Sequence, residues 1–198
     1  MSKNDRSFAR ASGLVSGLFS METLLNAVIL LGLTVLAWTC SYTVEAESEG
    51  VVLRFGKFVR TVEPGLHFKF PFGIDSVEVL PTRRQLKLEF GFATSGATNP
   101  YQSSKNSMDE KSMVTGDLNA ALVEWVVQYR IADPREYLFD VRHPDLTLRD
   151  LSEAVMREVV GDRTVDEVIT VGRQEIEVAA LARIQELARR YKLGIRVD

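Results

Sequence analysis

The stretch ALVEWVVQYRIADPREYLFD (Ala121–Asp140) contains a change of hydrophobic period that decides the class of fold. Over Ala121–Ile131 an apolar or aromatic residue occupies every odd position, which is typical of a β-strand with one buried face. Asp133 and Pro134 then supply a helix-capping residue and a first-turn proline, and they predict a short helix to about Phe139. We therefore expect a core strand that leads directly into helices.

Downstream of this stretch the sequence predicts three more helices and a final strand. A longer helix opens at His143 and ends near Val160, and Thr164–Glu167 matches the capping box of a short helix. The last helix spans about Arg173–Lys192, and a strand begins at Ile195–Val197. The side chains predicted to face the core from the two longer helices are Leu148, Leu151, Val155, Val159, Ile176, Ala180, Ile184, Leu187 and Tyr191.

Upstream, the sequence predicts further strands. Val51–Val59 is rich in β-branched and aromatic residues and predicts one strand, bent or bulged at Gly56. Ile74–Leu80 and Gln85–Phe90 alternate apolar and polar residues, as half-buried antiparallel strands do. Strands followed by helices and a closing strand indicate an α+β domain, with a mainly antiparallel sheet and helices packed on one side.

The segment VEPGLHFKFPF (Val62–Phe72) carries an unusual row of aromatic residues. Pro64 fixes its own φ and Gly65 accepts a positive φ, so the pair fits a type II turn and predicts a hairpin with a strand at Leu66–Phe70. The alternate residues of the returning strand, which share one face, are Leu66, Phe68, Phe70 and Phe72. The alternation alone leaves open a core, a partner surface or a membrane contact.

A transmembrane helix is predicted at Met21–Tyr42, because Leu24–Cys40 contains no charged residue. As a helix, Met21–Tyr42 is about 33 Å long, enough to cross a hydrocarbon core of about 30 Å. Trp38 and Tyr42 stand one turn apart at its end, where interfacial aromatic residues are expected. The alternatives are a buried core helix and a cleaved signal peptide, although a signal peptide has small residues before its cleavage site.

The charges that flank this helix predict its orientation. Three basic residues precede it, and the acidic residues Glu45, Glu47 and Glu49 follow it. Basic residues stay in the cytoplasm, so residues 1–20 are expected to form a short cytoplasmic tail, with the main domain on the far side. The aromatic segment follows the anchor closely, so we expect its apolar face to lie partly in a small core and partly against the outer lipid surface.

Residues with obvious chemistry are sparse. His67 and His143 have no partner at the spacing of a metal site or a catalytic triad, and the single cysteine, Cys40, excludes an internal disulfide. A net charge of −3 argues against nucleic acid as a partner. We predict no catalytic residue, metal or cofactor, and interpret the acidic residues of 153–167 as a solvated surface. A serine hydrolase assembled from distant residues is the alternative. Residues 91–117 lack any period and predict a long loop.

Three stretches resemble a known family. EGVVLRFGKFVRTVEPGLHFKFPF (Glu49–Phe72) resembles the opening of the SPFH or band 7 domain, which stomatins and prohibitins share. TGDLNAALVEWVVQYRIADPREYLFDV (Thr115–Val141) and LRDLSEAVMREVVGDRTVDEVITVGRQEIE (Leu148–Glu177) resemble the HflK family within it. The resemblance runs from about Glu47 to the end of the sequence.

The resemblance implies a fold and a function. The fold would be an SPFH domain over residues 45–198, with a membrane-proximal lobe at about 45–90 and a helical lobe at about 115–198. The function would be that of a scaffold without enzymatic activity in a bacterial inner membrane, with its domain in the periplasm. It would form homo- and hetero-oligomers with an HflC-like paralogue and restrict the access of substrates to an FtsH-like AAA protease. The alternative within the superfamily is a stomatin-type organiser of membrane microdomains.

In this family the domain continues into long helices, so the sequence is expected to be truncated after residue 198.

Overall fold

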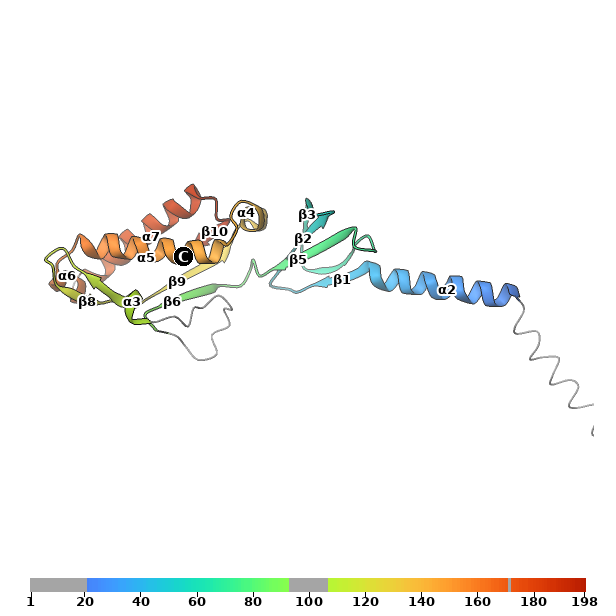
Figure 1. The fold of residues 1–198 in the computed structure, drawn as a ribbon, viewed down its shortest axis with the longest axis horizontal. Helices are drawn as coiled ribbons and strands as arrows, with labels where there is room; N and C mark the ends of the chain where they lie inside the picture. Colours follow the sequence, from blue (N-terminus) through green and yellow to red (C-terminus); the bar gives the residue numbers. More distant parts are fainter. Residues whose placement is uncertain (1–20, 93–106, 171) are drawn as a thin grey trace, which may run out of the picture.

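The structure, a computed structural model, describes residues 21–92, 107–170 and 172–198. The expected tail, residues 1–20, and residues 93–106 of the expected loop lie outside these ranges. Figure 1 shows the described parts in a row: helix α2 (Met21–Cys40), then a lobe made of strands, then a lobe of strands and helices. We call the first lobe, residues 41–80, the membrane-proximal lobe, after the position expected from the sequence, and the second, from residue 86 onward, the helical lobe. Residues 86–90 pair with residues 125–129, so they belong to the helical lobe and not, as expected, to the first lobe.

The membrane-proximal lobe consists of five short strands in two antiparallel sheets. One sheet pairs the strand that directly follows α2 with the strand after Pro64, and the other has the order β3-β2-β5. The lobe has a small core of Val44, Val52 and Val62, with Tyr42 and Val77 packed against it. The strands are β1 (Ser41–Val44), β2 (Glu49–Arg54), β3 (Lys57–Val62), β4 (Gly65–Phe68) and β5 (Asp75–Leu80).

Two predicted features of this lobe are wrong. The segment 51–59 is not one bent strand, because Phe55 and Gly56 have φ angles of 51° and 78° and form the turn of the β2–β3 hairpin. The turn at Pro64 does not close a hairpin either, because β4 pairs with β1 and β3 pairs with β2. Period-two alternation shows that a segment is a strand, but it does not say which strand lies beside it.

The helical lobe is built on a three-stranded antiparallel sheet of order β10-β9-β6, and it has a separate β7–β8 hairpin. Helices α5 and α7 cover one face of the three-stranded sheet (Figure 1). The predicted α+β class, with antiparallel sheets and helices on one side, is therefore confirmed. The elements are β6 (Leu86–Phe90), α3 (Ser107–Lys111), β7 (Ser112–Val114), β8 (Ala120–Leu122), β9 (Trp125–Ile131), α4 (Pro134–Phe139), α5 (Pro144–Gly161), α6 (Val165–Ile169), α7 (Arg173–Arg190) and β10 (Ile195–Val197).

The predicted helix starts and core stripes are mostly confirmed. Asp133 caps α4 by accepting hydrogen bonds from two backbone N–H groups, and Thr164 and Glu167 form the predicted capping box of α6. Leu148, Val155 and the predicted residues of α7 up to Ile184 are buried. Tyr191 is the exception: α7 ends at Arg190, and the Tyr191 side chain is 53% exposed.

Two further predictions for this lobe are corrected. The alternating segment 121–131 is not one strand, because it breaks between Leu122 and Trp125, and β8 pairs with β7 and not with the main sheet. The apolar alternation continues through the break and conceals it. The expected loop contains helix α3 and strand β7 in its last part, residues 107–114, which the sequence period did not reveal.

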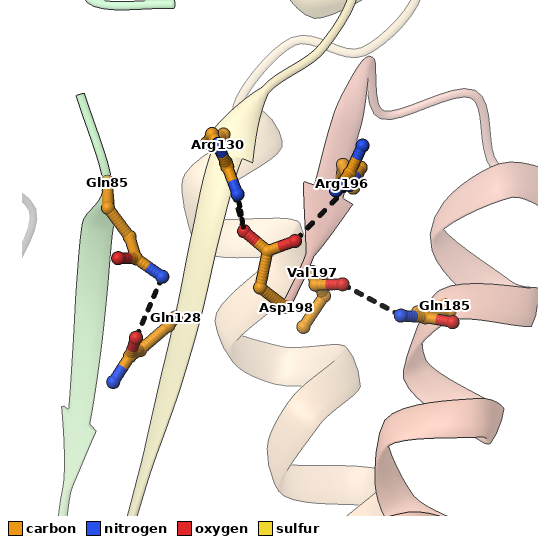
Figure 2. A network of polar contacts seen from close by, with 7 residues as sticks. All are labelled: Gln85, Gln128, Arg130, Gln185, Arg196, Val197 and Asp198. Atoms are coloured by element: carbon orange, nitrogen blue, oxygen red, sulfur yellow. Dashed lines mark hydrogen bonds and ion pairs between the residues drawn. The ribbon is translucent and has the colours of Figure 1, made fainter. Parts of the chain in front are cut away.

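Strand β10 is held by polar contacts as well as by its pairing with β9, as Figure 2 shows. Asp198 accepts hydrogen bonds from Arg130, at 2.6 Å, and from Arg196, at 3.2 Å. The Arg130 guanidinium group lowers the pKa of the Asp198 carboxyl group below its usual value. Gln185 on α7 donates to the carbonyl oxygen of Val197 at 2.8 Å. The final strand is therefore tied to the sheet and to the helix layer.

Candidate membrane-contact site

Helix α2 has the length and composition of a membrane-spanning helix. The segment Glu22–Cys40 has a mean hydropathy of 1.9, and none of it is buried against the rest of the described protein. Its leucines, valines and isoleucines are exposed along its whole length. A helix that is apolar all round and uncovered by protein is stable when hydrocarbon surrounds it, so α2 is a candidate transmembrane anchor.

Helix α2 runs into the membrane-proximal lobe without a linker. Helix α2 ends at Cys40, and β1 begins at the next residue, Ser41. The backbone N–H of Lys69, just after β4, donates to the carbonyl oxygen of Cys40 at 2.8 Å. The β1–β4 pair therefore continues directly from the helix end, and one backbone hydrogen bond ties the residue after β4 to the last residue of α2.

The residues predicted to form the aromatic face are all exposed. Exposed fractions are 63% for Leu66, 66% for Phe68, 55% for Phe70 and 89% for Phe72. The structure places none of them in the small core, contrary to the expectation that they share it. Strand β4 ends at Phe68, so Phe70 and Phe72 lie in the loop that leads to β5. Pro64 and Gly65 precede this row, and Gly65 has a φ of 139°.

The two expected interfacial aromatic residues occupy different elements. Trp38 lies in the last turn of α2 and is 82% exposed. Tyr42 is not in the helix: it lies in β1, opposite His67 in β4, and their ring centroids are 5.8 Å apart. Burial raises the pKa of the Tyr42 hydroxyl group. Among the described residues this hydroxyl group has no hydrogen-bond partner.

Each of the two histidines takes part in a hydrogen bond at a turn or a helix start. Nε2 of His67 donates to the carbonyl oxygen of Glu63 at 2.7 Å, across the bend that contains Gly65. His143 precedes α5, and its carbonyl oxygen accepts a hydrogen bond from the hydroxyl group of Thr147. Within residues 21–92, 107–170 and 172–198, no group of three His, Cys, Asp or Glu side chains is arranged to hold a metal ion.

An ion pair that sequence reasoning missed lies beside the loop between β4 and β5, residues 69–74, which we call the aromatic loop. Arg54 Nε lies 2.9 Å from Asp75 Oδ1, and the N–H of Phe70 donates to Asp75 Oδ2 at 3.2 Å. Asp75 is 6% exposed, and the hydrogen bond from Arg54 holds its pKa below the usual value. The two charged residues are 21 positions apart and belong to different strands, so no local pattern connects them.

The protein is thus an α+β domain that directly follows a candidate membrane-spanning helix and has exposed aromatic residues beside the end of that helix. The chain belongs to the SPFH domain / Band 7 family, which it matches over residues 42–197.

Several of its relatives are HflK proteins. The chain is 42% identical to Protein HflK of Treponema pallidum over 151 residues, which cover 75% of this chain and 46% of the relative. It is 32% identical to Protein HflK of Borreliella burgdorferi over 176 residues, covering 89% of this chain and 56% of the relative. It is 37% identical to the protein named Modulator of FtsH protease HflK of Escherichia coli K12 over 163 residues, covering 81% of this chain and 34% of the relative. The chain thus spans from about a third to just over half of the length of these relatives.

Proposed function

We propose that this protein is a membrane-anchored scaffold of the HflK type, which modulates an FtsH-like AAA protease and has no catalytic chemistry of its own. The observation that carries the proposal is the direct junction between α2 and the domain, at Cys40 and Ser41. A domain fixed in this way cannot leave the bilayer surface, which is where substrates of a membrane protease are found. The name of the Escherichia coli relative, Modulator of FtsH protease HflK, supports the identity of the protease.

The mechanism that we propose is steric. Copies of this chain and of an HflC-like paralogue pack side by side as homo- and hetero-oligomers, with their anchors in the bilayer, and they restrict access to the enclosed protease. The charges that flank α2 support a cytoplasmic N-terminus and a periplasmic main domain in a bacterial inner membrane. Such a wall needs no cofactor, and the proposed partners are lipid and protein, not nucleic acid.

The exposed aromatic row gives this scaffold a second contact with lipid. Phe68 pairs in register with Ser41, the first residue after α2, so Phe68 lies level with the helix end, whereas Leu66 pairs with Thr43 two residues further on. We place Leu66, Phe68, Phe70 and Phe72, which follow Pro64 and Gly65, at the outer interface of the bilayer, together with Trp38 and, at its edge, Tyr42. Moving one such side chain from water into an apolar environment contributes about 1.5–3 kcal/mol, so several of them would hold the lobe firmly.

Co-purification tests this function. An affinity-tagged full chain is expressed in the inner membrane, solubilised in mild detergent and recovered, and the HflC-like and FtsH-like proteins are quantified in the eluate. We expect both to be enriched over a control in which a tagged, unrelated single-pass protein of the same topology is expressed at the same level. A clean preparation that lacks both partners would contradict the proposal.

A further inference from the structure

Two exposed phenylalanines occupy left-handed backbone conformations at neighbouring turns. Phe55, in the β2–β3 turn, has a φ of 51° and is 80% exposed. Phe72, in the loop between β4 and β5, has a φ of 63° and is 89% exposed. Bulky residues rarely adopt this conformation, and where they do the strain is held in place by the surrounding structure. The contacts that hold these two turns therefore determine where the two side chains lie.

Backbone contacts join the two turns to each other and to the anchor. The N–H of Phe55 donates to the carbonyl oxygen of Ile74 at 2.9 Å, which ties the hairpin turn to the end of the aromatic loop. The start of the same loop is tied to the end of α2 by the hydrogen bond from Lys69 to Cys40. The loop between β4 and β5 therefore links the β2–β3 turn, at its far end, to the C-terminal end of α2, at its start.

Arg54 and Asp75 form an ion pair between the β2–β3 turn and the aromatic loop. They are register partners at the ends of β2 and β5, and Arg54 immediately precedes Phe55. Asp75 accepts from Arg54 Nε at 2.9 Å and Nη2 at 3.3 Å, and from the N–H of Phe70 at 3.2 Å. The Arg54 guanidinium carbon lies 4.6 Å from the centre of the Phe70 ring, a cation–π distance. One nearly buried carboxylate thus orients both the arginine and the loop.

We propose that Arg54 and Asp75 are positioning residues for an aromatic tip, composed of Phe55, Phe70 and Phe72, that enters the interfacial region of the bilayer beside the end of α2. This inference rests on the proposed lipid contact and deepens it, because it adds Phe55 to the contact and names the pair that presents it. The occupant is lipid because the tip is continuous with the membrane-spanning helix. The paired charges compensate each other, so the tip approaches the bilayer without an unpaired buried charge.

Depth-dependent fluorescence quenching tests this proposal. The chain has a single cysteine, so Cys40→Ser gives a background in which Phe72→Cys carries one NBD label. The full chain is reconstituted in vesicles of phosphatidylcholine and phosphatidylglycerol that contain lipids with a nitroxide near the headgroup. Leu118→Cys is the matched control site, because Leu118 is also non-glycine with a φ of 62° and is 87% exposed, but lies in the helical lobe.

We expect strong quenching at position 72 and none at 118, and we expect Asp75→Asn to reduce the quenching at 72 to the level of the control. Glu78→Gln removes a charge from an exposed position of the same strand and should leave the quenching unchanged. Near-ultraviolet circular dichroism checks that the lobe stays folded. If Asp75→Asn unfolds the lobe, Arg54→Lys replaces it as the test variant, because it keeps the positive charge but loses the two-point contact with Asp75. We expect Arg54→Lys to reduce the quenching at position 72 in the same way.

The possible failures are distinguishable. If, in the chain with Arg54 and Asp75 intact, the label at position 72 is quenched no more than the label at position 118, the proposed lipid contact is contradicted. Strong quenching at 72 that persists in a folded Asp75→Asn or Arg54→Lys variant would leave the lipid contact intact and overturn the positioning role of the pair.

Discussion

The hydroxyl group of Tyr137 lies 2.7 Å from Oδ2 of Asp145, and this buried contact joins helix α4 to the first turn of α5. The second carboxylate oxygen of Asp145 accepts from the hydroxyl group of Tyr129, at 3.0 Å, in the central strand β9. One carboxylate therefore connects the sheet to two helices. Its position near the N-terminus of α5 is also favourable for a negative charge.

Asp145→Ala should destabilise the helical lobe. The substitution removes two buried hydrogen bonds to the Asp145 carboxylate, from Tyr129 and from Tyr137, and a hydrogen bond to a charged group contributes about 1.5–3 kcal/mol. We expect the free energy of unfolding to fall by about 2–4 kcal/mol, as measured by chemical denaturation of the detergent-solubilised chain. Asp150→Ala, at an exposed position of the same helix, is the control and should change little. Equal effects of the two substitutions would contradict this prediction.

Arg149→Met should have a comparable effect for a different reason. Arg149 is 6% exposed, forms an ion pair with Glu110 in α3, donates to the carbonyl oxygen of Glu89 and lies over the ring of Phe90 at 4.6 Å. Removing one member of a buried ion pair leaves the other uncompensated, at a cost of about 3–5 kcal/mol. The backbone amides of α3 and β6 should exchange hydrogen faster in the variant than in the parent chain.

The matched control for Arg149 is Arg157→Met on the same helix. The Arg157 side chain is 48% exposed, pairs with Glu153 one turn away and donates one hydrogen bond to the carbonyl oxygen of Asp109 in α3. Exposed pairs contribute at most about 1 kcal/mol, so this variant should resemble the parent chain. A larger loss at residue 157 than at 149 would mean that burial does not set the cost.

Acidification should weaken the membrane-proximal lobe through Asp75. Its pKa is lower in the folded protein than its usual value of 3.8, because of the hydrogen bond from Arg54 first and that from Phe70 also. A lowered folded pKa contributes stability that is fully present above the unfolded pKa and is lost as the pH falls through the folded pKa. Asp75→Asn should therefore be less stable than the parent chain at neutral pH, and the difference should shrink below about pH 4. A difference that stays constant down to pH 2 would rule out this linkage.

Phe70→Ser combined with Phe72→Ser should weaken the contact of the lobe with the bilayer and barely change its folding. Both side chains are exposed, and substitutions at exposed sites usually change the free energy of unfolding by about 0.5 kcal/mol or less. Protection of β4 and the following loop from hydrogen exchange, measured in vesicles and in detergent, checks this. The vesicle-dependent protection should disappear in the double variant and persist in Leu118→Ser. Unfolding of the double variant would instead support a core role for the two rings.

The residues of the candidate site could be predicted from the sequence, but their arrangement in space could not. The row from Leu66 to Phe72 follows from alternation, and the apolar helix, which the structure ends at Cys40 and not at Tyr42, follows from the absence of charge over Leu24–Cys40; both patterns are visible in a short window. That all four apolar side chains of the row are exposed, and that Tyr42 lies in a strand opposite His67, depended on the pairing of β1 with β4. Phe55 was concealed inside a segment that looked like a continuous strand.

Features that depend on neighbours a few residues apart follow from the sequence alone. These include the caps at Asp133 and Thr164, the core stripe of α5 and the long uncharged helix α2, because hydrogen bonds within one turn and the period of one element are local. Tertiary structure alone decided which strands pair, and it brought Arg54 to Asp75 and Tyr129 to Asp145. Half-buried strands share the same period, so alternation cannot name their partners. Contacts between distant residues form only where packing of the whole chain compensates the entropy of bringing them together.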